Sequence, residues 1–338
     1  MNMRQWGFVA ALLCMMGTPK IVEAQLHGAG GSFPEPIYAK WFEKYKQGTS
    51  TQVSYQVIGS GPGVQALKNK TVDFGASDVP LTDAEEEQMP GKVVQFPTVG
   101  GAVVMTYNLP GLGAGLRFTP DVIADIFLGK IKTWSDARIK AINPGKTIPD
   151  LPIHPIHRQD GSGTTNIFTS YLTKVSPSWA AGPGTGKSVT WPGGGEGKGN
   201  GGVSTLVNAT PGGIGYVELA YAIEKSLPYG SVKNSAGNFI TPSDESVTEA
   251  IGDFLEQLNK DVRTPIVNGS GEDSYPISGL TFVLIYKDGA GQAGLAAKLW
   301  IWAMQDAQQK DAKALHYSPL PAGLLKHNLE LLKAVPGA

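Results

Sequence analysis

Hydrophobic and polar positions near the start of the chain follow the spacing of a helix. Residues 34–47 place their large apolar side chains three or four positions apart, at Ile37, Tyr38, Trp41, Phe42 and Tyr45. This spacing gathers them on one face and predicts an amphipathic helix. Ser32 is a favourable cap for this helix, and Pro34 suits its first turn, where the missing N–H costs nothing.

The pattern then alternates between strand and helix. Residues 51–59 alternate apolar and polar positions, which is typical of a strand, and after the interruption GSGPG a short helix is expected at 64–69. A stretch rich in Gly, Pro and Ser, 176–202, predicts a long surface loop. Further strands are expected at 72–78, 96–108, 151–158 and 212–218, and further helices at 119–131, 246–258 and 292–309. This alternation predicts an α/β fold with a mainly parallel sheet flanked by helices.

The first residues have the pattern of a secretory signal peptide. Arg4 precedes an apolar run at 6–17, and Val22, Glu23 and Ala24 form a small-residue cleavage pattern. The run is shorter than the roughly 20 residues that a membrane-spanning helix needs. We therefore expect a signal peptide over residues 1–24 and export to the periplasm.

Cys14 is the only cysteine of the sequence, so the mature chain cannot form a disulfide and depends on its apolar core. A lipid anchor on Cys14 is the alternative to cleavage after Ala24, but Leu13 stands where lipidation motifs place a small side chain. The 28 basic and 29 acidic residues nearly balance. This balance gives no indication of nucleic-acid or membrane binding.

Three short turns of glycine and hydroxyl residues share one chemistry. GGSF at 30–33, GSGPG at 59–63 and DGSGTT at 160–165 each precede a predicted helix. A helix N-terminus presents unpaired backbone N–H groups, and glycine allows a ligand to approach the backbone. One such turn is usually only a cap, but the three turns together with Arg158 and Asp78 predict a cradle for one tetrahedral oxyanion.

Five segments of the sequence carry a resemblance to a known family: HGAGGSFPEPIYAKW, VDFGASDVPLTD, RQDGSGTTNIFTSYL, GEGKGN and PGGIGYVELAYA. In this order they resemble the periplasmic phosphate-binding proteins of phosphate-specific ABC transporters. The resemblance implies a two-lobed α/β fold, in which each lobe is a mainly parallel sheet flanked by helices and two hinge strands join the lobes. It implies a first lobe at 25–100 and 280–338, and a second lobe at 101–279.

The resemblance also implies a phosphate site between the lobes. The implied contacts are Ser32, the N–H of Phe33, Ser60, Asp78, Arg158, Ser162, and Gly163 with Thr164. Asp160 is expected to orient Arg158, because a carboxylate aimed at an anion is repulsive unless a proton lies between them. The chain departs from the family at Ser32, where threonine is frequent, and at His157, where a second arginine is common.

Asp78 is the one expected acceptor in this site. At its ordinary pKa of about 3.9 it is expected to be ionised at neutral pH. Phosphate still carries a proton at that pH and can donate it to Asp78, whereas sulfate carries none. We therefore expect Asp78 to reject sulfate.

The implied partners are inorganic phosphate and the membrane permease and ATPase subunits of an ABC importer. The protein is expected to act as a monomer, without a cofactor, a metal or a catalytic step. A secreted phosphate-ester hydrolase is the alternative function. It would need metal ligands or an activated nucleophile, and DGSGT around Ser162 is not the G-x-S-x-G motif of hydrolases.

Other motifs give weaker indications. AGPGTGKS at 181–188 approaches a nucleotide P-loop, but no apolar strand precedes it and Pro192 blocks a following helix. His154 and His157 are three residues apart on a predicted strand, so they face opposite sides and do not form a metal pair.

Overall fold

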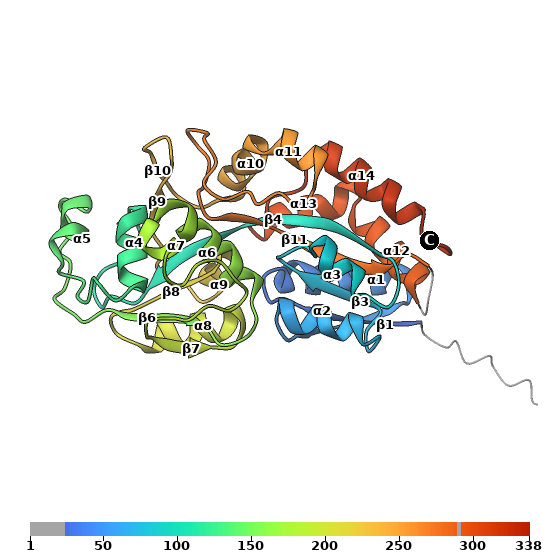
Figure 1. Ribbon diagram of the computed structural model, residues 1–338, viewed down its shortest axis with the longest axis horizontal. Helices are drawn as coiled ribbons and strands as arrows, with labels where there is room; N and C mark the ends of the chain where they lie inside the picture. The colour runs from blue at the N-terminus through green and yellow to red at the C-terminus, as the bar shows by residue number, and fades with distance from the viewer. Residues whose placement is uncertain (1–23, 289–291) are drawn as a thin grey trace, which may run out of the picture.

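The computed structural model describes residues 24–288 and 292–338. It consists of two α/β lobes placed side by side, with strands β4 (Val93–Tyr107) and β11 (Ser278–Tyr286) lying between them (Figure 1). The predicted signal peptide lies outside the described residues apart from Ala24. In the described part of the chain, no helix is both long and apolar enough to cross a membrane.

One mixed sheet extends through both lobes, in the order β2-β1-β3-β11-β4-β8-β6-β7. Its other strands are β1 (Gln25–Gly30), β2 (Gln52–Val57), β3 (Phe74–Ser77), β6 (His154–Arg158), β7 (Gly195–Gly197) and β8 (Gly213–Glu218). β1 pairs parallel with β2 and β3, and β6 pairs parallel with β7 and β8. The antiparallel pairs of this sheet all involve β4 or β11. The predicted two-lobed α/β fold is confirmed.

β4 belongs to both halves of the sheet. Its residues 93–102 pair with β11, and residues 103–107 pair with β8. Both strands are almost wholly buried and apolar, as expected for strands covered on both faces. A smaller sheet of β5 (Arg117–Phe118), β9 (Ser231–Lys233) and β10 (Phe239–Ile240) lies beyond β8 in the second lobe.

The first lobe joins the two ends of the described chain. Its helices are α1 (Glu35–Thr49), α2 (Ser60–Lys68), α3 (Asp83–Glu87), α12 (Ala293–Ala303), α13 (Asp306–Ala314) and α14 (Ala322–Lys333). The five apolar residues predicted to share one face of α1 are all buried. Tyr38 of α1 packs edge-on against Trp300 of α12, with ring centroids 4.9 Å apart, and the indole N–H of Trp41 donates to Gln308 O at 3.0 Å. These contacts hold the N-terminal and C-terminal segments in one core.

The second lobe has its own aromatic core. Its helices are α4 (Pro120–Phe127), α5 (Ala137–Ile142), α6 (Gly163–Val175), α7 (Pro177–Ala180), α8 (Gly199–Ala209) and α9 (Leu219–Glu224). Phe168 of α6 stacks on Tyr216 of β8, with ring centroids 4.4 Å apart. His157 stacks on Trp191 at 4.7 Å, while His154 at the other end of β6 is exposed, so the two histidines have separate surroundings.

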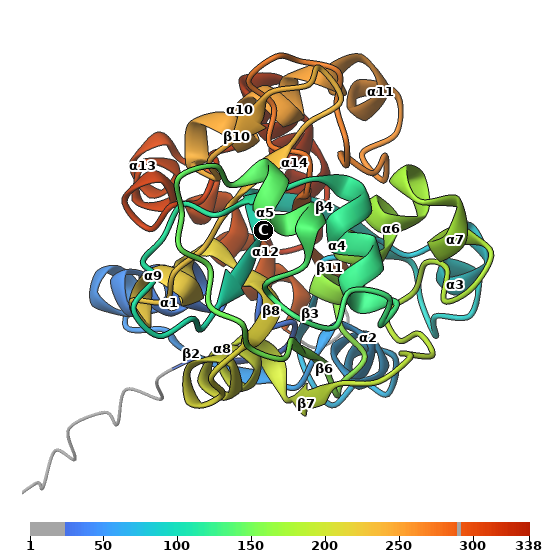
Figure 2. The same cartoon turned by 90° about the vertical axis from the view of Figure 1, so that its left-hand side faces the viewer.

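Helices α10 (Asp244–Asp253) and α11 (Leu255–Lys260) lie along the top of the molecule, beside α14 (Figures 1 and 2). They contact β4 and α14, although the sequence division assigns them to the second lobe. Thr248 and Ser318 share a hydrogen bond of 2.8 Å there. The predicted lobe boundaries therefore stay a prediction.

Several predicted elements differ in detail. Ser32 does not cap α1, which begins at Glu35 with Pro34 at its cap position. α2 begins at Ser60, inside the predicted break GSGPG, because Gly63 lets this first turn approach the backbone of β1. The loop predicted at 176–202 contains α7, β7 and the start of α8. The helices predicted at 246–258 and 292–309 are each divided in two, at Phe254 and at Met304–Gln305.

Candidate anion-binding site

Most of the predicted site residues lie at the carboxyl ends of parallel strands, where the two lobes face each other. Ser32 and Phe33 follow β1, and Asp78 follows β3. Ser60 begins α2 shortly after β2. Arg158 ends β6 and is followed by the N-terminus of α6. In open α/β sheets this edge is the usual place for a ligand.

Hydrogen bonds join these turns across the lobes. The N–H of Gly163 in the second lobe donates to Ser60 Oγ in the first at 3.1 Å, and within the first lobe the N–H of Asp78 donates to the same oxygen at 3.2 Å. The N–H of Gly61 donates to Gly161 O at 3.1 Å. The lobes are therefore closed on each other at this point, and the helix starts of α2 and α6 face one another.

The N-terminus of α6 lies in the predicted turn DGSGTT. Ser162 caps the helix, because its Oγ accepts from the N–H of Thr165 at 3.0 Å, and its own N–H donates to Lys187 O at 2.8 Å. The side chains of Ser162 and Thr164 are buried. The positive end of the helix dipole points toward the cleft. In the first turn, the N–H groups of Gly163 and Thr165 are already paired, with Ser60 Oγ and Ser162 Oγ.

Arg158 is held in place by Asp160. Its Nε donates to Asp160 Oδ1 at 2.8 Å, Nη2 contacts Asp160 Oδ2, and Nη1 donates to Thr164 Oγ1 at 3.3 Å. The Arg158 side chain is only 1% exposed. Burial acts to raise the pKa of Asp160, but the hydrogen bonds and charge of Arg158 outweigh it and the pKa is lowered. Asp160 is thus an ionised partner that fixes the plane of the guanidinium.

Asp78 is buried in the cleft at the start of the loop after β3. Its Oδ1 accepts from Thr281 Oγ1 of β11 at 2.8 Å, and its Oδ2 lies 3.5 Å from Ser60 Oγ. Burial raises its pKa to about 7, although the Thr281 hydrogen bond and the charge of Arg158 act in the opposite direction. The ordinary pKa expected from the sequence is therefore wrong for Asp78. Near neutral pH the group is divided between its protonated and ionised forms.

The sequence did not identify three residues that hold the Ser32–Phe33 turn, Asn200 and Tyr221 of the other lobe and Tyr317 of the same lobe. The N–H of Asn200 donates to Ser32 Oγ at 2.9 Å, and the Tyr221 hydroxyl donates to Ser32 O at 2.7 Å. The Tyr317 hydroxyl donates to Phe33 O at 2.7 Å. Asn200 and Tyr221 do stand in two of the segments that carry the family resemblance, GEGKGN and PGGIGYVELAYA. Their place in these two segments was the only signal by which the sequence could have pointed to them.

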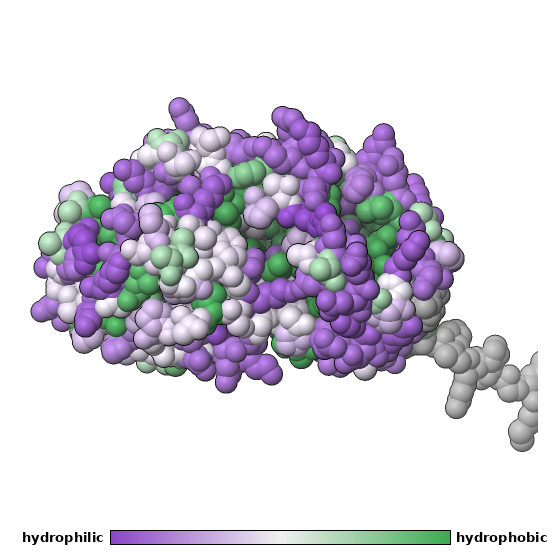
Figure 3. Space-filling view, viewed as in Figure 1, coloured by the Kyte–Doolittle hydropathy of each residue, from purple (hydrophilic) through white to green (hydrophobic). Residues whose placement is uncertain are grey.

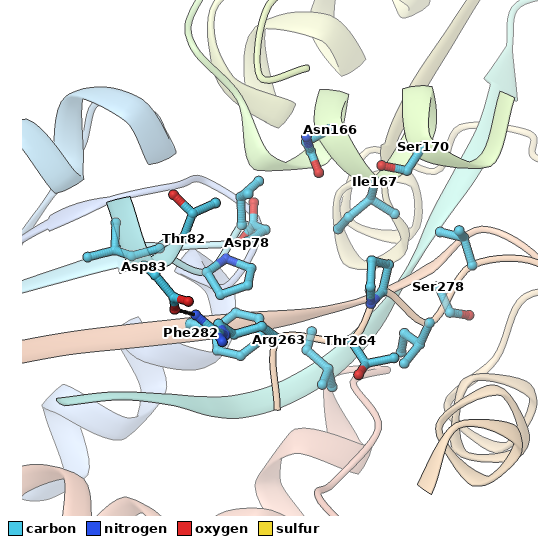
Figure 4. Close-up of a pocket in the computed structure, with 18 residues that line it drawn as sticks. Asp78, Thr82, Asp83, Asn166, Ile167, Ser170, Arg263, Thr264, Ser278 and Phe282 are labelled. Atoms are coloured by element: carbon cyan, nitrogen blue, oxygen red, sulfur yellow. Dashed lines mark hydrogen bonds and ion pairs between the residues drawn. The ribbon is translucent and has the colours of Figure 1, made fainter. Parts of the chain in front are cut away.

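A groove between the lobes leads to Asp78. Figure 3 shows apolar side chains in the hollow between the two halves, and Figure 4 shows a pocket that reaches the Asp78 carboxylate. Its volume is about 370 Å³. The first turns of α6 line one wall, and Arg263, ion-paired with Asp83, lies on the opposite side. The walls are mainly apolar, formed by Val79, Pro80, Leu81, Ile167, Pro265, Ile266, Val267, Leu280 and Phe282.

The geometry does not favour covalent chemistry at Ser162. A catalytic serine needs a base in contact with it, but the nearby His157 stacks on Trp191 and directs its Nδ1 toward Arg158 O, 3.3 Å away. Within residues 24–288 and 292–338, no cluster of His, Cys, Asp and Glu side chains is arranged to hold a metal ion. The P-loop-like segment 181–188 is not followed by a helix.

The arrangement suits a small anion that carries a proton. It brings together the helix starts of α2 and α6, one oriented guanidinium and the hydroxyls of Ser32, Ser60 and Thr164. These groups supply hydrogen-bond donors to an oxyanion. Asp78 adds one group that can accept a hydrogen bond when it is ionised.

The chain matches the family model of the PBP superfamily domain over residues 19–307. It is 43% identical over 305 residues to the phosphate-binding protein PstS of Xylella fastidiosa (strain 9a5c), covering 89% of this chain and 83% of that protein. It is 42% identical over 314 residues to the phosphate-binding protein PstS of Haemophilus influenzae, covering 92% of this chain and 93% of that protein.

The fold is also similar to a solved structure, that of a high-affinity periplasmic phosphate-binding protein (PfluDING) bound with phosphate. The TM-score is 0.71 at 21% sequence identity, and the match covers 90% of this chain and 92% of that chain. At this identity the likeness establishes the shared fold.

Proposed function

We propose that this chain, which belongs to the PstS phosphate-binding protein family of the PBP superfamily, binds inorganic phosphate between its two lobes and delivers it to a membrane ABC importer. The observation that carries the proposal is the convergence of donors from both lobes beside Asp78. Gly163 on one lobe and Ser60 on the other are already in hydrogen-bonding contact. An anion bound beside this contact would complete the interface.

We infer the ligand contacts from the same convergence. Arg158 supplies the positive charge, and Asp78 accepts a hydrogen bond from the O–H of phosphate. The remaining contacts come from hydroxyl and backbone N–H groups, which suit the oxygens of a tetrahedral oxyanion. The proposed contact residues are Ser32, Phe33, Ser60, Asp78, Arg158, Ser162, Gly163 and Thr164.

The lobes are proposed to open and close about β4 and β11. The proposed division assigns 25–100 and 280–338 to one lobe and 101–279 to the other, with crossings near 98–107 and 275–285. The continuous strand β4, paired with β11 along its first part and with β8 along its last, supports a hinge at this place. Closure of two lobes around a ligand is the common motion of such proteins.

The finer features of transport are also proposals. After removal of residues 1–24, the protein would act in the periplasm as a monomer and present phosphate to permease and ATPase subunits. It would need no cofactor and would break no bond. The hydrolase alternative has no support from the geometry, because the Ser162 oxygen accepts from Thr165 N and no histidine among the described residues hydrogen-bonds to it.

Isothermal titration calorimetry of dialysed protein tests the proposal directly. Phosphate should bind at one site per chain, and sulfate at the same concentration should bind far more weakly. A chromogenic phosphate ester should remain unhydrolysed by the same preparation. A protein that releases no binding heat with phosphate, and is not protected by phosphate against thermal unfolding, would contradict the proposal.

A further inference from the structure

Asn200 stands at the start of α8 and contacts both lobes of the site. Its N–H and its side-chain Nδ2 both lie within hydrogen-bonding distance of Ser32 Oγ, at 2.9 and 3.0 Å. The same Nδ2 lies 3.2 Å from Thr164 Oγ1, on the second lobe. Asn200 is fully buried. One amide group thus touches two of the hydroxyls that the proposed function assigns to phosphate.

The orientation of this amide follows from its fourth contact. The backbone N–H of Glu218 lies 3.1 Å from Asn200 Oδ1. A backbone N–H can only donate, so the atom facing it must be the amide oxygen. The amide nitrogen therefore faces Ser32 and Thr164, and it can only donate to them.

These contacts fix the direction of two hydroxyl hydrogens. A hydroxyl oxygen has two acceptor positions and one hydrogen. Ser32 Oγ accepts twice, from the N–H and the Nδ2 of Asn200. Thr164 Oγ1 also accepts twice, from Asn200 Nδ2 and from Arg158 Nη1 at 3.3 Å. Within the described residues both oxygens act only as acceptors, so each O–H is left to donate to a ligand.

We propose that Asn200 is a positioning residue for phosphate: by filling the acceptor positions of Ser32 Oγ and Thr164 Oγ1, it turns both hydroxyl hydrogens toward the bound anion. The inference rests on the proposed function, and it assigns this role to a residue that need not touch phosphate itself. Because Ser32 lies on one lobe and Thr164 on the other, both hydroxyls are oriented in this way only when the lobes are closed.

The inference predicts a distinct order of affinities among variants. Asn200→Ala keeps the backbone donor to Ser32 but frees both hydroxyls to rotate, so phosphate affinity should fall by about tenfold, the size of one lost hydrogen bond. Asn200→Asp puts an acceptor where Nδ2 stood. Both hydroxyls would then donate to the new carboxylate, and affinity should fall by about 100-fold or more at pH 8, as for a mispaired buried charge.

Two measurements separate positioning from a general structural role. As pH falls from about 8 to about 5, the introduced carboxyl can take up a proton and donate, so the affinity gap between Asn200→Asp and Asn200→Ala should narrow. The second measurement is a double-mutant cycle with Thr164→Val. Thr164 lies on the same lobe as Asn200, so a coupling between them cannot come from holding the lobes together. We expect the double variant to lose less affinity than the two single losses combined.

Asn208→Asp is the matched control, because Asn208 is an exposed asparagine on the same helix α8. It should bind phosphate like the wild type. Two results would overturn the inference and leave the proposed function intact. One is that the affinity losses of Asn200→Ala and Thr164→Val are strictly additive. The other is that Asn200→Asp and Asn200→Ala bind phosphate with equal affinity at every pH. The cycle decides the matter even if Asn200→Asp does not fold. A wild type that does not bind phosphate would instead overturn the proposed function, and the inference with it.

Discussion

Gly163 of the second lobe lies directly against the Asp78 carboxylate of the first. A Cβ atom on Gly163 would stand 2.4 Å from both Asp78 Cβ and Asp78 Oδ2. Neither neighbour can move far, because Asp78 is also held by Thr281 at 2.8 Å. The absence of a side chain at this position is therefore a condition of lobe closure.

Replacing Gly163 with alanine should weaken phosphate binding without unfolding the protein. The added methyl keeps the lobes apart, and an overpacked contact costs roughly 1 to 3 kcal/mol, which is about 5- to 150-fold in affinity. Gly161→Ala is the control, since its Cβ would meet Pro62 Cδ at 3.6 Å and Gly61 Cα at 3.9 Å, which are ordinary contacts. Calorimetry on both variants checks the prediction, and equal affinities would contradict it.

Replacing Arg158 should remove most of the affinity. Truncating a buried, hydrogen-bonded charge typically costs about 2 to 5 kcal/mol, or some 30- to several-thousand-fold. Arg158→Lys should be intermediate, because the charge remains but the planar fork of donors is lost. Arg138→Ala, at an exposed arginine of the same lobe, should bind normally. An Arg158→Ala protein within about twofold of wild type would place the phosphate elsewhere.

Sulfate binding should depend on pH through Asp78. Above a pKa of about 7 the carboxylate can only accept, so it pairs with the proton of phosphate and repels sulfate. Below that pH the protonated carboxyl can donate to sulfate, so sulfate affinity should rise as pH falls. In Asp78→Asn the amide donates at every pH, and the discrimination should relax. Titrations of both anions at pH 6 and pH 8 test this; an unchanged phosphate-to-sulfate ratio in the variant would mean that selectivity lies in other groups.

Glu218 should make the folded protein less stable as pH rises. The Tyr317 hydroxyl lies 2.7 Å from Phe33 O and 3.0 Å from Glu218 Oε2. Its single hydrogen goes to Phe33 O, so the contact with Glu218 is a hydrogen bond only if Glu218 carries a proton and donates it to the Tyr317 oxygen. Burial raises the pKa of Glu218 well above its usual range. A raised folded pKa gives stability that is complete below the unfolded pKa, about 4.3, and is lost as pH rises through the folded pKa.

The measurement for Glu218 is urea unfolding of wild type and Glu218→Gln between pH 5 and pH 8. Relative to the variant, the free energy of unfolding of the wild type should fall by up to about 1.4 kcal/mol per pH unit. The quantity to compare is the slope of the unfolding free energy against pH. The absolute values of the two proteins also differ because the amide of Glu218→Gln changes the local hydrogen bonds. Glu224→Gln, at an exposed glutamate on α9, is the control and should keep the wild-type slope. Parallel curves for all three proteins would show that Glu218 is ionised in the fold.

Phosphate should shift the protein toward the closed form described here. Small-angle scattering of the saturated protein should fit this closed arrangement, and removal of phosphate should increase the radius of gyration. The melting temperature should rise with phosphate concentration, because the ligand binds only the folded chain. Scattering curves that do not change with phosphate would argue against the hinge while leaving binding itself intact.

The sequence predicted the features that depend on local pattern. The turns after the strands and the buried face of α1 follow from spacing and residue type. Ser32 shows the limit of this reasoning. It has the right side chain for a helix cap, yet its oxygen accepts from Asn200, 168 residues away in the chain. No local pattern contains such a contact.

The pKa of Asp78 could not be predicted from the sequence for the same reason. Its shift comes from burial between two lobes, and its partners Thr281 and Arg158 lie on distant strands. The start of α2 inside GSGPG is a third case, since Gly63 is needed there for its close approach to Gly30. In each case tertiary packing decides what the local residues leave open.

The pairing of β4 with two different strands affects how the two lobes could open. β11 pairs with β4 up to Ala102, and β8 pairs from Val103 onward. A twist localised between these two residues would leave the ladder on each side intact, so the proposed opening would resemble the bending of a continuous ribbon. Such a motion would exchange few backbone hydrogen bonds between strands. An anion that contacts both lobes would then stabilise the closed shape by its higher affinity for it, and its departure would restore the open one.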